Sequence, residues 1–476
     1  MKWFSSQAVR VWRHDWRRDL LLRRVLKNSS YLFASNAIGA VLSIVTANLL
    51  GVAGFGVLGL LTSFVAGVNR LFSFRMGDVV VKYMGEALAR EEKDRAAVVV
   101  KAAMLVEAVT SLAAYVFLVV ITPLAARYVI KDDGTGDALE ASLLLLYGLS
   151  ILANITTETS TGVLQVTNHY RSQALISLLQ SVLVAVMVGF AYAYQGGLEM
   201  VVWAYLIGKV ILGMGPILLA FYWLRRVLGS GWWRAPWSLL PPRRELVHFA
   251  ISTNFSGTIN LIARDSEVTW VGLFFNATVA GYFKTALAII TLIVMPINPL
   301  ISTTYPEITR AFAARSWARL RSLLQKVSLI AAGWTGAVIV GLLLVGRQVL
   351  FQPWTIFGRT FQVYDAEFAP ALGVLMVLLI GFGWANIFFW NRPLMLAQGK
   401  AGLALRVGFW SMLAKVSLAL AAFVVLPWLG APRPGYIFEA ALLSGYFMLS
   451  VGILVWSGLR EIDRAEAAAT LQGEPA

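Results

Sequence analysis

The chain has 476 residues, of which 58% are hydrophobic and 14% charged, and its mean hydropathy is +0.71. This composition excludes a water-soluble protein of this size and predicts an integral membrane protein. The absence of cysteine excludes disulfides and thiolate chemistry, and the three histidines do not pair at ligand spacing, so we predict no metal site.

The formal net charge of +15 does not indicate a nucleic-acid partner, because the basic residues cluster at predicted membrane edges. The first such cluster is the segment 1–27, in which lysines and arginines alternate with tryptophans. It lacks the continuous apolar core of a cleavable signal peptide. We predict a basic amphipathic helix on the cytoplasmic leaflet, with a flexible basic tail as the alternative.

Beyond residue 27, apolar runs of about 20 residues recur along the chain, which is the length that spans a bilayer as a helix. They predict an all-α integral membrane protein with twelve transmembrane helices. Basic residues fall mainly on segments that this count places inside, so both termini are predicted to be cytoplasmic. The predicted spans are 31–51, 55–79, 98–122, 141–164, 174–194, 200–224, 248–275, 282–305, 328–346, 368–391, 403–427 and 436–458.

The two halves of the chain resemble each other. The glycine-rich stretch Leu50–Val57 follows the first predicted helix, and a similar stretch, Phe275–Phe283, follows the seventh. A second pair of stretches, Leu164–His169 after the fourth predicted helix and Leu394–Lys400 after the tenth, lies at nearly the same offset. These two pairs predict two six-helix bundles related as parallel repeats, an arrangement that places a substrate site at the repeat interface. The predicted parts are an N-terminal segment 1–27, a bundle 28–224, a basic Trp/Pro linker 225–247, a bundle 248–459 and a cytoplasmic tail 460–476, which we expect to fray.

Polar residues within the first four predicted helices are candidates for a substrate pathway. Asn36 lies on a small, polar face of the first helix, a pattern that also suits close helix packing. Arg70, Arg75 and Asp78 lie near the inner end of the second helix. Arg70 and Arg75 either bind an anionic substrate, with Asp78 balancing their charge, or serve structure alone. In the structural alternative Arg75 and Asp78 pair to lock packing, and the arginines extend to lipid phosphates. Glu107 and Glu158, in the third and fourth helices, could balance a cation or carry a coupling proton, although Glu158 also suits an interhelical hydrogen bond.

The seventh predicted helix carries the most unusual polar residues of the chain. Arg264, Asp265 and Glu267 interrupt an otherwise apolar segment, and Asn260 lies one turn earlier. Charges at membrane depth are costly, so a functional site is the default hypothesis. Helical spacing places Thr253, Gly257, Asn260, Arg264 and Glu267 on one face. Arg264 is the strongest candidate for an anionic headgroup, and a structural pair with Glu267 is the alternative.

Lys284 and Lys415 lie deep within the eighth and eleventh predicted helices. The cost of an ammonium in hydrocarbon predicts that one or both face a water-filled lumen. No nucleotide-binding Gly-x-x-x-x-Gly-Lys-Ser/Thr motif occurs, so we predict no cofactor, and an ion gradient or the membrane potential remains as the energy source.

Several of these stretches resemble a known family. Arg264-Asp265-Ser266-Glu267 followed by Val271-Gly272 and Gly281-Tyr282-Phe283 is similar to a pattern of polysaccharide transporters, and so are Lys27–Leu32 and Leu49–Gly56. Over roughly residues 27–460 the chain resembles the polysaccharide transporter (Wzx-like) oligosaccharide flippases of the multidrug/oligosaccharidyl-lipid/polysaccharide exporter superfamily. Asn276 departs from that pattern, in which glycine is commoner.

The resemblance implies a multi-pass transporter of a bacterial or archaeal plasma membrane, and no enzyme. Its substrate would be a polyprenyl-(pyro)phosphate-linked oligosaccharide, moved from the inner to the outer leaflet for O-antigen, exopolysaccharide or capsule assembly. Two bundles would alternate access to a cationic lumen. Expected partners are membrane lipids, the lipid-linked oligosaccharide, and a polysaccharide polymerase and glycosyltransferases.

Three alternatives remain open on the sequence alone. A multidrug or peptidoglycan-precursor exporter would share the fold, but a drug exporter should have an acidic pocket instead of many membrane cations. A membrane glycosyltransferase would need a catalytic carboxylate or histidine on a sizeable outer loop, and the outer segments here are short. A non-transporting scaffold of an assembly complex is the third.

Overall fold

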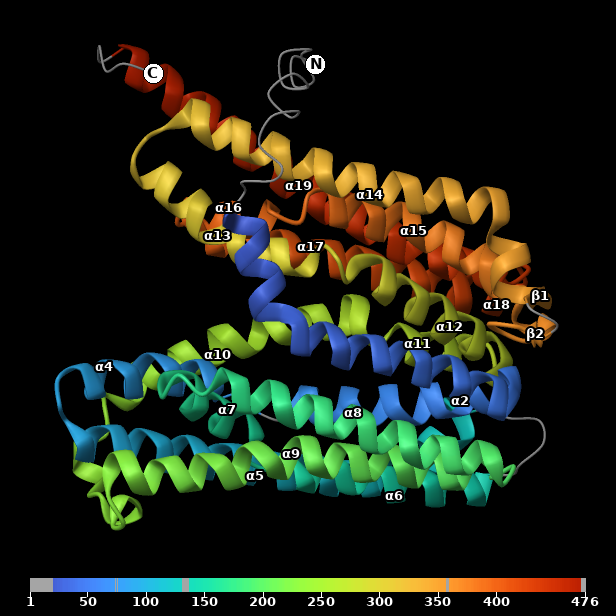
Figure 1. Ribbon diagram of the computed structural model, residues 1–476, viewed down its shortest axis with the longest axis horizontal. Coiled ribbons are helices and arrows are strands. Elements are labelled where there is room, and N and C mark those ends of the chain that lie inside the picture. The colour runs from blue at the N-terminus through green and yellow to red at the C-terminus, as the bar shows by residue number, and fades with distance from the viewer. Residues whose placement is uncertain (1–19, 73, 75, 131–136, 357–358, 472–476) are drawn as a thin grey trace. The chain divides into compact units, whose positions relative to one another are not determined.

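A computed structural model of the protein describes residues 20–72, 74, 76–130, 137–356 and 359–471. The described chain is helical apart from one two-stranded antiparallel hairpin, in which Trp354 pairs with Phe361 (Figure 1). Residues 1–19 of the predicted amphipathic segment 1–27 therefore lie outside the described residues. Residues 20–27 form the beginning of the first described helix. Arg75 also lies outside the described residues.

The described chain divides into two compact units. The first unit is formed by residues 34–284, and the second unit by residues 20–33 and 285–471. The unit formed by residues 34–284 contains most of α2 (Leu20–Phe72), the beginning of α12 (Ala277–Val294), and all elements between them. These are α3 (Gly77–Val79), η1 (Val80–Met84), α4 (Gly85–Ala89), α5 (Lys93–Tyr128), α6 (Asp137–Ala153), α7 (Thr157–Val166), α8 (Tyr170–Ala193), α9 (Leu198–Leu228), η2 (Trp232–Arg234), η3 (Trp237–Leu239), α10 (Arg243–Asn260), η4 (Leu261–Asp265) and α11 (Glu267–Phe274).

The second unit contains the beginning of α2 up to Phe33, the remainder of α12 and the elements that follow it. In this unit α14 packs against α15, and both α15 and α17 pack against α19. The residue bounds predicted from the sequence repeat, 28–224 for one six-helix bundle and 248–459 for the other, stay a prediction. The elements are α13 (Asn298–Ala313), α14 (Trp317–Phe351), β1 (Trp354–Ile356), β2 (Arg359–Phe361), η5 (Ala366–Phe368), α15 (Ala371–Ile387), α16 (Asn391–Ala397), α17 (Ala401–Leu420), η6 (Ala421–Val425), α18 (Leu426–Trp428) and α19 (Tyr436–Leu471).

Ten helices in the described part of the chain are long and apolar enough to cross a membrane. One of them, Ala34–Phe72, covers both the first and the second predicted span, because α2 runs through a kink at Gly51. Gly51 has φ 66° and ψ 178°, a conformation that glycine adopts without steric cost. The seventh predicted span, 248–275, is divided among α10, η4 and α11. All twelve predicted spans therefore have a counterpart.

The predicted linker 225–247 is part of the first unit and packs against helices of that unit. Trp232 and Ala235 are buried in a hydrophobic cluster with α5 and α9, and Lys101 Nζ donates to the Ala235 carbonyl at 2.6 Å. The prediction that the C-terminal tail frays is wrong for residues 460–467. There α19 continues as a helix, Ile462 is buried, and Arg321 forms ion pairs with Asp463 and Glu466. Packing and charge pairing outweigh the polar, alanine-rich composition of this segment.

The glycines of the two repeated stretches allow α2 and α12 to touch backbone to backbone. A Cβ atom added to Gly56 would lie 1.8 Å from the Ala277 carbonyl oxygen, and one added to Gly281 would lie 2.2 Å from the Val52 carbonyl oxygen. Real side chains do not approach a carbonyl this closely. The similarity between the two stretches therefore reflects a helix crossing that only glycine permits.

Replacing Gly56 with alanine should destabilise the protein by roughly 3 kcal/mol, because the backbones must separate to admit the new methyl group. Thermal unfolding of the purified protein in detergent measures this change. Gly39 is a matched control, since a Cβ added there meets nothing within 4 Å and alanine should slightly favour the helix. Equal melting temperatures for the two variants would contradict the close crossing.

Candidate functional site

The seventh predicted helix contains a π-helical turn, η4, between α10 and α11. The Ser266 N–H donates to the Leu261 carbonyl at 2.9 Å, five residues back. This wider turn rotates everything after it relative to a regular α-helix, and such turns are frequent at functional sites. Arg264 is exposed as a result, whereas Glu267 is fully buried. The prediction that Arg264 and Glu267 share one polar face is therefore wrong.

Arg264 instead shares the carboxylate of Asp265 with Arg70. Arg264 Nε donates to Asp265 Oδ1 at 2.7 Å, and Arg70 Nη1 donates to Asp265 Oδ2. The side chains of Arg70, Arg264 and Asp265 are 39%, 44% and 23% exposed. These three residues, which we name the Arg70–Asp265–Arg264 cluster, carry a net charge of +1, and none of their side chains is buried.

Three features position this cluster within the first unit. Arg70 lies in the last turn of α2, and the Thr269 hydroxyl donates to the Ser63 hydroxyl at 3.0 Å, which ties α11 to α2. The Trp270 indole N–H donates to the Ile262 carbonyl at 3.0 Å and so braces the π-helical turn. The two guanidinium groups are therefore held near each other by packing, and Asp265 separates them.

The other candidates from this part of the chain lie apart from the cluster and differ in exposure. Lys284 is buried against Gly59, and its ammonium lies 4.2 Å from the centre of the Phe55 ring. Asn260 is half-buried, Asn36 and Asp78 are exposed, and Arg75 lies outside the described residues. The structure thus brings together Arg70, Arg264 and Asp265 but does not add Lys284 to them. Lumen exposure of Lys284 stays a prediction.

The side chain of Glu107 contacts the N-terminal end of α7. Its two carboxylate oxygens accept the backbone N–H groups of Glu158 and Thr159, each at 2.9 Å. Glu107 therefore caps the N-terminus of α7, the second half of the broken fourth helix, where backbone N–H donors have no helical partner. A role for Glu107 or Glu158 in ion coupling stays a prediction.

Lys415 lies in the second unit with a partner that the sequence reasoning missed. Its Nζ atom is 3.7 Å from Glu439 Oε1, and the two side chains are 2% and 0% exposed. Lys415 comes from α17 and Glu439 from the first turn of α19. Because the two residues belong to different helices, no short-range spacing indicates the pair.

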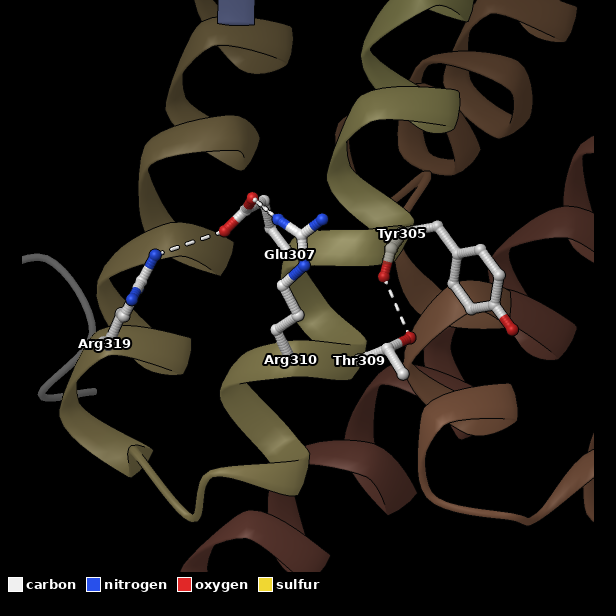
Figure 2. A network of polar contacts seen from close by, with 5 residues as sticks. All are labelled: Tyr305, Glu307, Thr309, Arg310 and Arg319. Atoms are coloured by element: carbon white, nitrogen blue, oxygen red, sulfur yellow. Dashed lines mark hydrogen bonds and ion pairs between the residues drawn. The ribbon is translucent and has the colours of Figure 1, made fainter.

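Glu307, Arg310 and Arg319 were also missed as a group (Figure 2). Arg310 Nη1 donates to Glu307 Oε1 at 2.8 Å, and Arg319 Nη2 donates to Glu307 Oε2 at 3.2 Å. The three-residue spacing of Glu307 and Arg310 on one helix could have indicated the first contact. The contact to Arg319 depends on the turn between α13 and α14.

Comparisons with known proteins agree with this architecture. Residues 22–312 match the model of a family described as "Polysaccharide biosynthesis protein". The chain is 23% identical over 376 residues to the inner membrane protein YghQ of Escherichia coli K12, a match that covers 74% of this chain and 97% of that protein.

Solved structures of the MATE family share the fold. An inward-facing multidrug resistance MATE transporter of the MOP superfamily aligns with a TM-score of 0.70 and 14% identity over 91% of this chain and 96% of that one. A MOP-superfamily transporter from Pyrococcus furiosus, whose binding pocket is described as having reversed polarity, aligns with a TM-score of 0.58 and 14% identity over 94% and 96%. The fold is therefore that of these transporters, with twelve membrane helices in two bundles.

Proposed function

Because the chain belongs to the polysaccharide biosynthesis protein family and is a multi-pass inner-membrane transporter with the MOP-superfamily fold, we propose that it is a flippase for lipid-linked oligosaccharide. Its substrate is a polyprenyl-(pyro)phosphate-linked glycan, which it carries from the cytoplasmic to the outer leaflet. The glycan serves surface polysaccharide assembly.

The observation that carries this proposal is the Arg70–Asp265–Arg264 cluster. Guanidinium groups stay charged at any accessible pH and bind phosphate oxygens with two parallel N–H donors. Two of them meet here on one carboxylate, and all three side chains are partly exposed. A pyrophosphate, with more oxygens and more charge than a carboxylate, can replace Asp265 as their partner.

The lipid chemistry explains why such a site is needed. A pyrophosphate and its sugars cannot enter hydrocarbon unaided, because removing charge from water is costly without compensating partners. The cluster supplies cations for the phosphates, and the polyprenyl chain stays in the surrounding bilayer. Alternating access between the two bundles then exposes the headgroup to each side in turn.

A transport assay in proteoliposomes tests this proposal. The purified protein is reconstituted with a fluorescent polyprenyl-pyrophosphate-linked saccharide, and flipping is read from quenching of the dye in the outer leaflet. The proposal expects flipping of this lipid, but neither flipping of a neutral polyprenyl glycoside nor transport of a cationic dye. Transport of the cationic dye alone would favour a multidrug exporter and overturn the proposal.

A further inference from the structure

The second unit carries a cluster of the same composition as the first. Glu307 and Arg310 from α13 and Arg319 from α14 again place two guanidinium groups on one carboxylate, at 2.8 and 3.2 Å (Figure 2). We infer that Arg310 and Arg319 form a second binding site, for the phosphate group of a lipid at the cytoplasmic membrane surface. The site deepens the proposed function: it would receive the headgroup of the flippase substrate before transport.

The two arginines are available to a ligand. The side chains of Arg310 and Arg319 are 74% and 73% exposed, whereas that of Glu307 is 23% exposed. Exposed ion pairs contribute little to stability, because water and salt screen them and the long side chains lose conformational freedom. A phosphate group offers each guanidinium two acceptor oxygens and can therefore exchange with the carboxylate at little cost to the fold.

The turn between α13 and α14 holds the arginines in position. The buried residues Ile308, Ala311 and Leu320 anchor both helices in the hydrophobic core of the second unit. Phe312 and Trp317 pack edge to face with their ring centres 5.5 Å apart, and the Ser316 N–H donates to the Ala311 carbonyl at 3.0 Å. A ligand therefore meets two guanidinium groups whose helices are already fixed.

The location favours a lipid phosphate. The segment 310–326 is one of those that the distribution of basic residues places on the cytoplasmic side, and α14 continues from it into a membrane-spanning segment. Figure 2 shows that Tyr305 and Thr309 lie on another side of α13 from the cluster, so neither of these two side chains adds to the pair of arginines. This suits a phosphate group and gives little basis for recognising a particular sugar.

Binding measurements on the full-length protein test this site. The Arg70→Ala/Arg264→Ala protein serves as the background, because it lacks the first cluster. Native mass spectrometry in detergent would compare three probes: geranylgeranyl pyrophosphate, phosphatidylglycerol and inorganic pyrophosphate. In this background, Arg310→Ala together with Arg319→Ala should weaken binding of the preferred probe about tenfold. Glu307→Gln should strengthen it several-fold, because the competing carboxylate loses its charge.

Arg95→Ala is the matched control. Arg95 forms an ion pair of the same three-residue spacing, with Glu92 at 3.0 Å, and this contact joins one guanidinium to the carboxylate. Its loss should leave binding unchanged. Unchanged binding in the double-alanine variant, or weaker binding and a lower melting temperature in Glu307→Gln, would show that the cluster only fastens the turn and would overturn the inference.

The three probes identify the source of the phosphate. Preference for geranylgeranyl pyrophosphate supports capture of the flippase substrate, preference for phosphatidylglycerol supports an ordinary phospholipid headgroup, and equal binding of inorganic pyrophosphate supports recognition of the phosphate alone. Because the assay measures binding without transport, failure of the flippase proposal would leave this result intact. Conversely, an absence of lipid binding at Arg310 and Arg319 would not contradict flipping that depends on the Arg70–Asp265–Arg264 cluster.

Discussion

Replacing Arg70 and Arg264 together with alanine is expected to reduce flipping of the lipid-linked oligosaccharide about a hundredfold. Each guanidinium contributes a charge-assisted contact to the pyrophosphate, and the two contacts together correspond to roughly 3 kcal/mol. The double variant should still reach the membrane with an unchanged melting temperature, because both side chains are partly exposed. Dye quenching in proteoliposomes measures the flipping rate.

Asp265 provides the complementary test. Asp265→Asn keeps the size of the side chain but removes the charge that competes with the substrate for Arg70 and Arg264. The KM for the lipid-linked substrate should therefore fall in this variant. Wild-type flipping in the double-alanine variant, or an unchanged KM in Asp265→Asn, would mean that the cluster is only an ion pair that joins α2 to η4.

The membrane fold could be predicted from the sequence because each membrane-spanning helix is formed by consecutive residues. Apolar runs of bilayer length mark each helix, and the repeated glycine stretches around Gly56 and Gly281 indicate where two halves correspond. The structure adds the reason for those glycines, which is the contact between the α2 and α12 backbones. The break at Gly51, where two helices meet at a kink within α2, coincides with the end of the first predicted span at residue 51.

The polar contacts could be predicted only in part, because they depend on tertiary structure. The charges of the seventh helix were identified, but the assignment of Arg264 to the face of Glu267 assumed a regular helix. The π-helical turn that ends at Asp265 changes the register by one residue, and no residue in it signals this. Arg70 and Asp265 are 195 positions apart, so only the folded chain shows that they meet.

Removing one partner of the buried Lys415–Glu439 pair is expected to destabilise the protein by about 3–5 kcal/mol, because the remaining charge stays buried without its ion-pair partner. The side chains are 2% and 0% exposed, so water cannot readily take the place of the missing partner. Lys415→Met and Glu439→Leu should each lower the melting temperature, whereas the double variant should recover most of the loss, since an apolar pair of similar volume needs no charge compensation.

The same double variant decides between two roles for Lys415. If the pair only joins α17 to α19, the Lys415→Met/Glu439→Leu protein should flip its substrate at the wild-type rate once stability is restored. If Lys415 also meets the substrate phosphate, as its depth in the membrane predicts, flipping should stay low despite a recovered melting temperature. Additive losses of stability in the two single variants would contradict the pairing itself, because residues in direct contact couple and independent ones do not.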